Sequence, residues 1–152
     1  MSNRDSDRPL VTVATIVVRD GAFLCVEEET SAGVRLNQPA GHLEIGESIV
    51  DAAARETLEE TAYVVKPVAL VGIYRWQMPS SSTTFVRFAF TADVLAHEPA
   101  RTLDAGILRA QWLDYDTLRA RSAEHRSPLV MRCIEDYLAG TRMPLSLLTE
   151  VA

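Results

Sequence analysis

Three glutamates near the middle of the chain have the spacing of a metal site. Glu56, Glu59 and Glu60 stand at positions i, i+3 and i+4, so a helix would place them on one face. Their charges repel one another unless a cation neutralises them, and carboxylate oxygens suit Mg²⁺ or Mn²⁺. A solvent-exposed acidic helix is the alternative, because glutamate-rich helix surfaces are common.

The segment around these glutamates also supplies a counter-charge. Arg55 directly precedes Glu56, and Glu47 closes a polar loop that begins at Gly41. An arginine fork on the Glu47 carboxylate would fix this loop against the helix. An ordinary i,i+4 pair between Arg55 and Glu59 is the alternative.

A helix is required to position these groups, and helical periodicity is clearest over residues 48–63. The side chains expected on its packing face, nearly opposite the glutamates, are Val50, Ala54, Thr57, Leu58 and Thr61.

The rest of the chain alternates between strand and helix patterns. The β-branched run at 10–18 predicts a buried strand, and Asp20-Gly21 predicts a hairpin into a second strand at 22–28. Further strands are expected at 34–38, 68–77, 84–95 and 109–113, and further helices at 114–122 and 128–138. This order favours an α/β sheet covered on both faces, although the pattern does not give the strand order.

Composition narrows the class of protein. The chain has 152 residues, of which 47% are hydrophobic, and a net charge of −6, as expected for one globular domain that needs no disulfides. The acidic balance argues against a nucleic-acid polymer as partner, but a bound cation would still allow small anionic substrates. Cys25 and Cys133 lack metal-site spacing and are expected to be buried thiols.

The N-terminal nine residues are polar, and no apolar run approaches the roughly 18 residues of a membrane span. We therefore expect no signal peptide, no membrane partner and a cytoplasmic location. The expected organisation is a disordered lead-in at 1–9, one domain at 10–142 and a tail at 143–152.

The loop and helix together resemble the Nudix box, G-x5-E-x7-R-E-U-x-E-E-x-G-U, in which U is a bulky aliphatic residue. Six of its glycine and charged positions are filled here, by Gly41, Glu47, Arg55, Glu56, Glu59 and Glu60. Segments 38–44, 75–76, 85–88 and 126–130 extend the likeness towards the NudJ-type phosphatase branch of that family.

Three positions depart from the box. Thr57 replaces an aliphatic residue, and its hydroxyl can bond back along the helix. Ala62 replaces a glycine that would cap the helix in the left-handed conformation, and Tyr63 is aromatic. Pro67 is expected to end the helix by Lys66.

The resemblance implies an α/β/α sandwich with a mixed sheet. It also implies Mg²⁺, or alternatively Mn²⁺, held by the Gly41 carbonyl and by Glu56, Glu59 and Glu60, with Glu56 the further candidate for orienting the attacking water. Asp104, Glu28 and Glu44 are outside candidates for the base, and each is more simply a surface acid.

Three residues outside the helix are candidates for substrate binding. His42 follows Gly41 and is placed to touch a phosphate. Arg87 lies in an apolar strand, where a phosphate contact and a salt bridge are equally good interpretations. Trp76 would stack on a substrate ring or, as the preferred interpretation, pack in the core. The polar loop 78–83 is a surface connection or a lid.

These observations predict a Mg²⁺-dependent hydrolase of a small phosphorylated metabolite. Mg²⁺ would neutralise the phosphate charge and activate a water for in-line attack, with Arg55 and Glu47 supporting the site. The expected substrates are nucleoside tri- or diphosphates or thiamine-type diphosphates, with orthophosphate released. The alternatives are a nucleoside triphosphate pyrophosphohydrolase that releases pyrophosphate, and a non-catalytic nucleotide-binding module. The chain could be a monomer or a homodimer.

Overall fold

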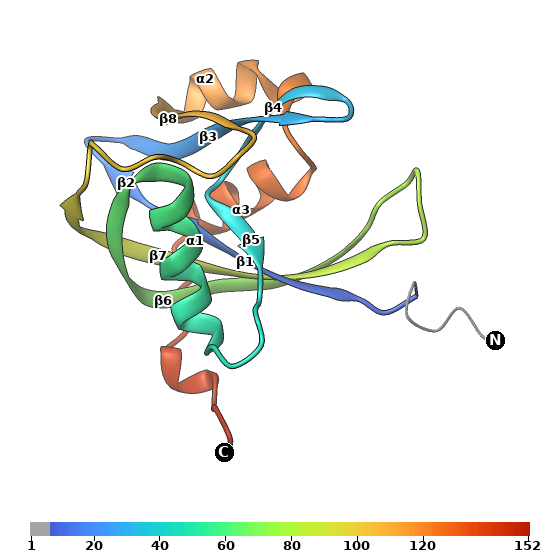
Figure 1. Cartoon of the computed structure of the whole chain (residues 1–152), viewed down its shortest axis with the longest axis vertical. Coiled ribbons are helices and arrows are strands. Elements are labelled where there is room, and N and C mark those ends of the chain that lie inside the picture. The colour runs from blue at the N-terminus through green and yellow to red at the C-terminus, as the bar shows by residue number, and fades with distance from the viewer. Residues whose placement is uncertain (1–6) are drawn as a thin grey trace.

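A computed structural model describes residues 7–152 as two β-sheets packed with helices (Figure 1). Most of the predicted lead-in, residues 1–6, lies outside the described residues, and the first strand begins at Leu10. The strands are β1 (Leu10–Ile16), β2 (Val18–Arg19), β3 (Ala22–Thr30), β4 (Gly33–Asn37), β5 (Ala40–His42), β6 (Tyr63–Gln77), β7 (Thr84–His97) and β8 (Ile107–Asp114). The helices are α1 (Ile49–Thr61), α2 (Tyr115–Ala120) and α3 (Leu129–Leu138), with 3-10 turns at Ser122–Glu124 and Leu145–Leu147.

The strands divide into a mixed sheet and an antiparallel sheet. The mixed sheet has the order β5-β1-β7-β6, in which β1 and β7 are parallel and the other pairs are antiparallel. In the antiparallel sheet, β3 pairs with β2, β4 and β8. The strand order, which the sequence pattern did not supply, makes β5 an edge strand of the mixed sheet.

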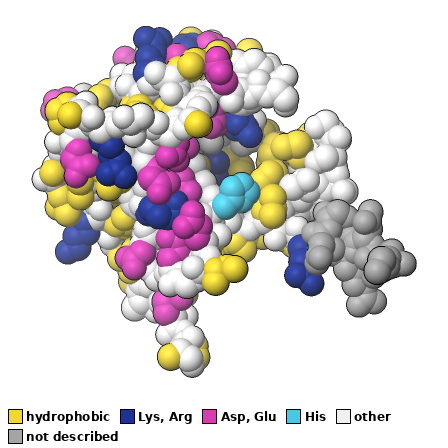
Figure 2. Space-filling model, in the orientation of Figure 1, with side chains coloured by type: hydrophobic (Ala, Val, Ile, Leu, Met, Phe, Trp, Pro, Cys, Tyr) yellow, Lys and Arg dark blue, Asp and Glu magenta, His cyan; other side chains and the backbone are white. Residues whose placement is uncertain are grey.

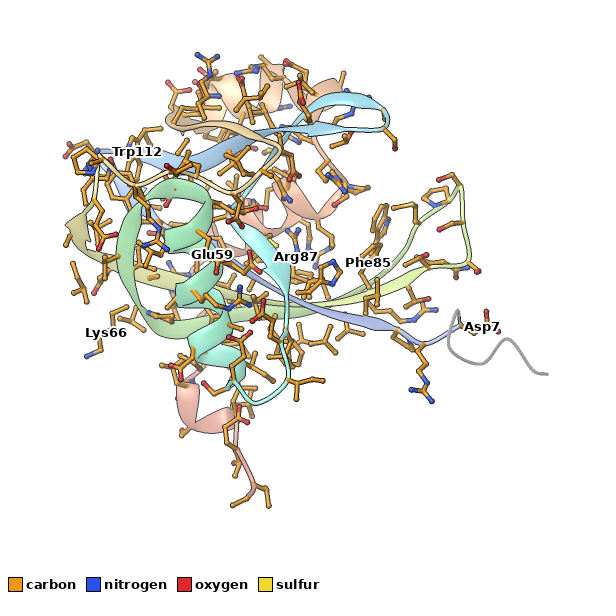
Figure 3. The ribbon with its side chains drawn as sticks, viewed as in Figure 1. Asp7, Glu59, Lys66, Phe85, Arg87 and Trp112 are labelled. Atoms are coloured by element: carbon orange, nitrogen blue, oxygen red, sulfur yellow. The ribbon has the colours of Figure 1, made fainter. Side chains whose placement is uncertain are left out.

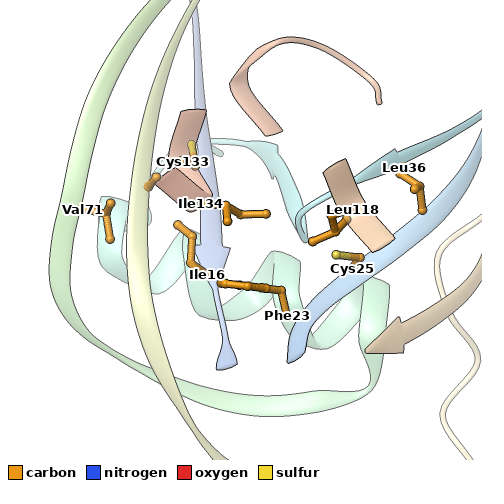
Figure 4. Close-up of a cluster of buried hydrophobic side chains, with 9 residues drawn as sticks. Ile16, Phe23, Cys25, Leu36, Val71, Leu118, Cys133 and Ile134 are labelled. Atoms are coloured by element: carbon orange, nitrogen blue, oxygen red, sulfur yellow. The ribbon is translucent and has the colours of Figure 1, made fainter. Parts of the chain in front are cut away.

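Helices cover both faces of the mixed sheet. On one face, Ala52 and Ala53 of α1 pack in a buried cluster with Val13 and Phe90. On the other face, α3 contributes to a second cluster that also joins the antiparallel sheet and α2 (Figure 4). Its buried members are Ile16, Phe23, Cys25, Leu36, Val71, Ala89, Leu118, Cys133 and Ile134. The predicted α/β/α arrangement and the two buried thiols are therefore confirmed, with the antiparallel sheet as an addition.

Helix α1 is two residues shorter at its C-terminus than predicted. Ser48 is its N-cap and accepts a hydrogen bond from the Asp51 amide, whereas the helix ends at Thr61. The expectation that Pro67 ends the helix is wrong, because Ala62 already turns the chain with a left-handed φ of 64°. Alanine therefore holds the conformation that the family glycine would adopt without steric cost.

The buried face of α1 also differs from the prediction. Thr57 and Thr61 are buried as expected, but Val50, Ala54 and Leu58 are only partly buried. The fully buried small side chains are Ala52 and Ala53. The helix lies against β5 and β6 as well as β1, so its contact surface is rotated towards the glutamates. The Thr57 hydroxyl donates to the Ala53 carbonyl at 2.8 Å and lies 2.7 Å from that of Thr15 on β1.

Two strands differ most from the prediction. The three-residue β5 lies within the segment read as loop, and β6 begins at Tyr63 rather than at residue 68. Consequently β6 and β7 form a long hairpin whose far end projects as an arm from the body (Figure 1). The loop 78–83 closes this arm, where the Met78 amide bonds to the Thr83 carbonyl at 3.0 Å.

The C-terminal segment packs against the domain. Met143 exchanges two backbone hydrogen bonds of 2.8 Å with Leu70 on β6. Leu145 and Leu148 pack against the cluster below α1, and the Glu150 carboxylate accepts from the Ile49 amide at 3.2 Å. Within residues 7–152, no helix has the length and apolar character needed to cross a membrane.

Candidate active site

Three carboxylates from two segments meet beside α1. One carboxylate oxygen from each of Glu56, Glu59 and Asp104 lies within 4.8 Å of the others. Asp104 belongs to the connection between β7 and β8, and its amide donates to the Glu59 carbonyl at 3.0 Å. The group closest together therefore includes Asp104, which the sequence favoured as an ordinary surface acid.

Glu60 has a different environment from its two neighbours on α1. It is 7% exposed, and its carboxylate accepts a 2.8 Å hydrogen bond from the Ala40 amide of β5. Glu56 lies directly against Gly41 of the same strand, and a Cβ at Gly41 would overlap its carboxylate. Two carboxylates of α1 therefore lie close to the edge strand β5. The contact with Glu56 explains why glycine is needed at position 41, because any side chain there would overlap the carboxylate.

Arg55 ties the loop before α1 to the helix. It forms a bidentate fork on Glu47, with Nε–Oε2 of 2.8 Å and Nη2–Oε1 of 2.7 Å, as expected from the sequence. The same guanidinium donates to the His42 carbonyl, to Glu56 and to Glu59, at 3.0, 2.9 and 3.1 Å. Arg55 therefore forms the i,i+4 pair with Glu59, which was the alternative interpretation, in addition to the fork on Glu47.

Burial and Arg55 act in opposite directions on these acids. Burial raises the pKa of Glu56, whereas the hydrogen bond from Arg55 lowers it. Burial raises the pKa of Glu60 to about 8, since only the Ala40 amide and no arginine offsets its desolvation. For Glu47, the Arg55 hydrogen bond dominates and lowers the pKa. The helix therefore holds carboxylates with unequal proton affinities.

A cavity of about 420 Å³ opens beside the carboxylates. Figure 2 shows acidic side chains gathered over α1, with a hollow towards the β6–β7 arm. The lining residues are Thr12, Glu28, Asn37, Ala40, Gly41, His42, Glu44, Glu56, Glu60, Trp76, Met78, Phe85, Arg87, Arg126, Ser127 and Leu129.

One face of the mixed sheet forms the floor of this cavity. The strand register places His42, Thr12 and Arg87 in one row across β5, β1 and β7, so their side chains share a face. Phe85 and Trp76 pair in the adjacent row towards the arm. Glu59, Arg87 and Phe85 follow one another from α1 towards the arm in Figure 3.

Arg87 is the buried cation of the cavity, at 6% exposure. Its Nη1 donates to the Gln38 side chain at 3.1 Å and its Nη2 to the Asn37 side chain at 3.3 Å. Among the described residues, no partner for its buried Nε is found. The salt bridge considered for Arg87 is therefore not formed between residues 7–152, because both hydrogen-bonding partners are neutral amides.

The remaining predicted residues lie around the same cavity. Trp76 stacks on Phe85, with ring centroids 5.8 Å apart, and belongs to none of the buried clusters, so the preferred interpretation of core packing is wrong. His42 and Glu44 are exposed at the rim. Glu28 also lines the cavity, where it pairs with Arg126 at 3.1 Å.

Sequence reasoning gave no site role to the residues that support Arg87 and close the cavity, although Gln38 and Arg126 lie in segments that resemble the NudJ-type branch. Asn37 ends β4 and Gln38 follows it, while Arg126 precedes α3, far along the chain from the helix that carries the glutamates. Nothing in their spacing indicated a shared site, because their contacts come from the packing of β4 and α3. Gln38 also donates to the Val130 carbonyl of α3 at 2.6 Å.

The residues fit a divalent cation of the hard class. Glu56, Glu59 and Asp104 offer carboxylate oxygens close enough to share one ion, and such oxygens suit Mg²⁺, Mn²⁺ or Ca²⁺. Gly41 brings the β5 backbone against Glu56, so its carbonyl is near a candidate ligand. The acids are thus arranged for metal-assisted chemistry on an anion in the adjoining cavity.

Comparisons with known proteins agree with this site. The NUDIX domain model matches residues 8–133. The proteins named Phosphatase NudJ from Shigella boydii serotype 4 and Escherichia coli K12 are each 38% identical over 141 residues, covering 93% of this chain and 91% of theirs.

Solved structures of Nudix hydrolases are also similar to this chain. A NUDIX hydrolase from Nitrosomonas europaea superposes with a TM-score of 0.92 at 50% identity, covering 95% of this chain and 98% of that one. A UDP-X diphosphatase shares the fold, with a TM-score of 0.71 at 21% identity over 90% of this chain and 66% of its own. With Gly41, Glu56 and Glu60 of the box at one cavity and the match spanning most of the chain, this protein belongs to the Nudix hydrolase family.

Proposed function

We propose that this chain is a Mg²⁺-dependent hydrolase that cleaves the terminal phosphoanhydride bond of a small phosphorylated metabolite and releases orthophosphate. The candidate substrates are nucleoside tri- and diphosphates and thiamine-type diphosphates. The observation that carries the proposal is the group Glu56, Glu59 and Asp104 beside a cavity that also holds the buried Arg87. The phosphatase name of relatives 38% identical supports release of orthophosphate.

In this proposal, each part of the site has a separate task. Glu56, Glu59 and Asp104, with the Gly41 carbonyl, hold the cation, and Glu60 of α1, which accepts from the Ala40 amide of β5, supports it. The cation, Mg²⁺ or alternatively Mn²⁺, supplies Lewis-acid stabilisation of phosphate charge when it is bound. Arg55 holds the loop through Glu47, and the acids that line the cavity accept the proton of the attacking water. Within residues 7–152, no serine or cysteine nucleophile paired with a base faces the cavity, which favours direct attack by water.

Metal dependence is tested by removing the ion and one ligand. We expect EDTA to abolish phosphate release and Mg²⁺ or Mn²⁺ to restore it. Glu59→Gln should weaken Mg²⁺ binding at least tenfold while the chain stays folded, because loss of one charge relieves repulsion in the metal-free site. Glu135→Gln, at an exposed position of α3, is the matched control. Turnover that survives exhaustive chelation would exclude the proposal.

The position of attack is tested by isotope labelling. Hydrolysis of a nucleoside triphosphate in ¹⁸O-water should place the label in orthophosphate and leave a nucleoside diphosphate. Pyrophosphate as the main product would instead identify the pyrophosphohydrolase alternative. Nucleotide binding without any product, in the presence of Mg²⁺, would identify a non-catalytic binding module.

A further inference from the structure

We propose that Arg87 binds the phosphate on the leaving-group side of the scissile bond, while the terminal phosphate lies at the carboxylates. This inference rests on the proposed function and adds the direction in which the substrate lies. It is carried by the environment of Arg87, by the strand register and by the aromatic pair beside it.

The environment of Arg87 is that of an anion-binding cation. The half-buried arginines Arg55, at the site, and Arg121, after α2, each contact carboxylates. Arg87 is more buried than either, and among residues 7–152 it contacts only neutral groups. The nearby Cys133 adds no negative charge, because burial raises the pKa of its thiol. A buried cation without a counter-charge is costly, and an anionic ligand would remove that cost.

The guanidinium is also held in advance. Gln38 accepts from Arg87 and donates its own amide to Val130 of α3, so its orientation is fixed from both sides. Asn37 holds the second terminal nitrogen. These amides fix the position of the arginine without neutralising it, and the buried Nε keeps a free donor. Such a preorganised donor stabilises charge that develops during a reaction.

The strand register sets the distance from Arg87 to β5, the strand that lies against Glu56 and Glu60. Arg87 and His42 lie two strands apart in one row, so their Cα atoms are separated by about 10 Å. The Glu56 carboxylate lies against Gly41, the neighbour of His42 on β5, and both Glu56 and Arg87 line the cavity. Two linked phosphates in this cavity would contact the carboxylates with one phosphate and Arg87 with the other.

The aromatic pair gives the substrate its direction. Phe85 precedes Arg87 by two residues on the same face of β7, and it stacks with Trp76 at an interplanar angle of 21°. The order from α1 to the arm is therefore carboxylates, cation, aromatic surface (Figure 3). An organic group on the aromatic surface would leave its first phosphates at Arg87 and its last phosphate at the carboxylates.

The chemical step is balanced with this placement. The water oxygen bonds to the terminal phosphorus, and the bond from that phosphorus to the bridging oxygen breaks. The electron pair stays on the bridging oxygen of the leaving phosphate, beside Arg87, and the water proton passes to an acid of the cavity. Arg87 therefore stabilises the charge that appears on the leaving group.

The test compares two non-hydrolysable ligands, methylenediphosphonate and methylphosphonate, in the presence of Mg²⁺. By calorimetry, Arg87→Gln should weaken methylenediphosphonate binding about 10- to 100-fold, the worth of a charge-assisted hydrogen bond, and methylphosphonate binding less than twofold. Arg75→Gln is the matched control, because Arg75 is exposed on the opposite face of the adjacent strand. It should leave both affinities unchanged.

Stability separates a binding role from a structural one. The unliganded Arg87→Gln chain should melt at the same or a higher temperature, since it no longer buries an uncompensated charge. A lower melting temperature, or an equal loss of affinity for both ligands, would overturn the proposal. In the wild-type chain, methylenediphosphonate should shift one arginine Nε–H signal in the NMR spectrum, and Arg87→Lys should remove that signal. No shift would also overturn the proposal.

These ligands report binding without turnover. If the chain proves not to be a hydrolase, the selective effect of Arg87→Gln on the diphosphonate still identifies the anion site. If the chain hydrolyses substrates but Arg87→Gln weakens the binding of both ligands equally, the proposed function is retained and the proposed orientation of the substrate is wrong.

Discussion

At the scale of single residues, Arg55 donates hydrogen bonds to three acids, Glu47, Glu56 and Glu59, and to the His42 carbonyl. It thereby links the loop before α1 to the helix. Its fork on Glu47 anchors the loop that carries Gly41, and its contacts with Glu56 and Glu59 reduce the repulsion on α1. One side chain thus affects both the fold of the loop and the placement of the metal ligands, so its loss should be visible in stability and in rate.

We expect Arg55→Ala to lower the free energy of unfolding by about 2–3 kcal/mol, since charge-assisted bonds are lost and acids are left unpaired. Hydrolysis should fall in parallel. Arg55→Lys should restore only part of each quantity, because lysine cannot form the bidentate fork. Urea denaturation and initial rates measure the two effects. An unchanged midpoint together with an unchanged rate would show that the fork is dispensable.

Ala62 affects stability through its backbone conformation. It adopts a φ of 64° at the end of α1, which a Cβ disfavours. Ala62→Gly should therefore raise the free energy of unfolding by about 0.5–1 kcal/mol, with little change in rate. The control is Ala139→Gly at the end of α3, where φ is −71° and glycine should destabilise by roughly 0.5 kcal/mol. Destabilisation by Ala62→Gly would mean that the buried methyl group outweighs the strain.

At the scale of elements, Glu27 connects β3 to β8 and to the segment after α2. It accepts bonds from Arg109, Gln111 and Arg121, at distances of 2.8–3.1 Å. The Arg109 hydrogen bond is the main cause that lowers its pKa from 4.5 to about 2, against the opposing effect of burial. The ionised carboxylate is therefore favoured in the folded chain.

The linkage has a definite sign. Because folding lowers the Glu27 pKa, its contribution is present above pH 4.5 and is lost as the pH falls towards 2. Glu27→Gln should cost about 2 kcal/mol at pH 7, and the difference from wild type should shrink between pH 4.5 and 2. Denaturation midpoints across this pH range measure it. A difference that stayed constant with pH would assign the effect to packing rather than charge.

At the scale of the whole molecule, the C-terminal segment closes the cluster beneath α1. Residues 143–150 pair with β6, pack two leucines and contact the first turn of α1. We therefore propose that the folding unit extends to Glu150, beyond the boundary at 142 expected from the sequence.

Removal of residues 143–152 should lower the free energy of unfolding by about 3 kcal/mol, the sum expected from two partly buried leucines and the lost backbone bonds. Removal of residues 151–152 alone, which are exposed, should have no effect. Differential scanning calorimetry compares the two truncations. Equal melting temperatures for all three chains would show that the segment contributes nothing to the folding unit.

The sequence by itself determined the local features of this protein. The alternation of strands and helices, a helix within residues 48–63, the Arg55–Glu47 pair and the buried cysteines follow from short-range periodicity, composition and charge spacing. The carboxylates of α1 could be recognised because their spacing is fixed by one helical turn, whatever the helix packs against.

Only the tertiary structure decided how distant segments meet. The placement of β5 at an edge brings Gly41 against Glu56, and the β7–β8 connection brings Asp104 close to Glu56 and Glu59. Whether Arg87 forms a salt bridge within the described residues depended on what β4 and the segment after it present to it, and these offer neutral amides. These contacts join residues 15 to 50 positions apart, and the periodicity of one element carries no information about the side chains of another.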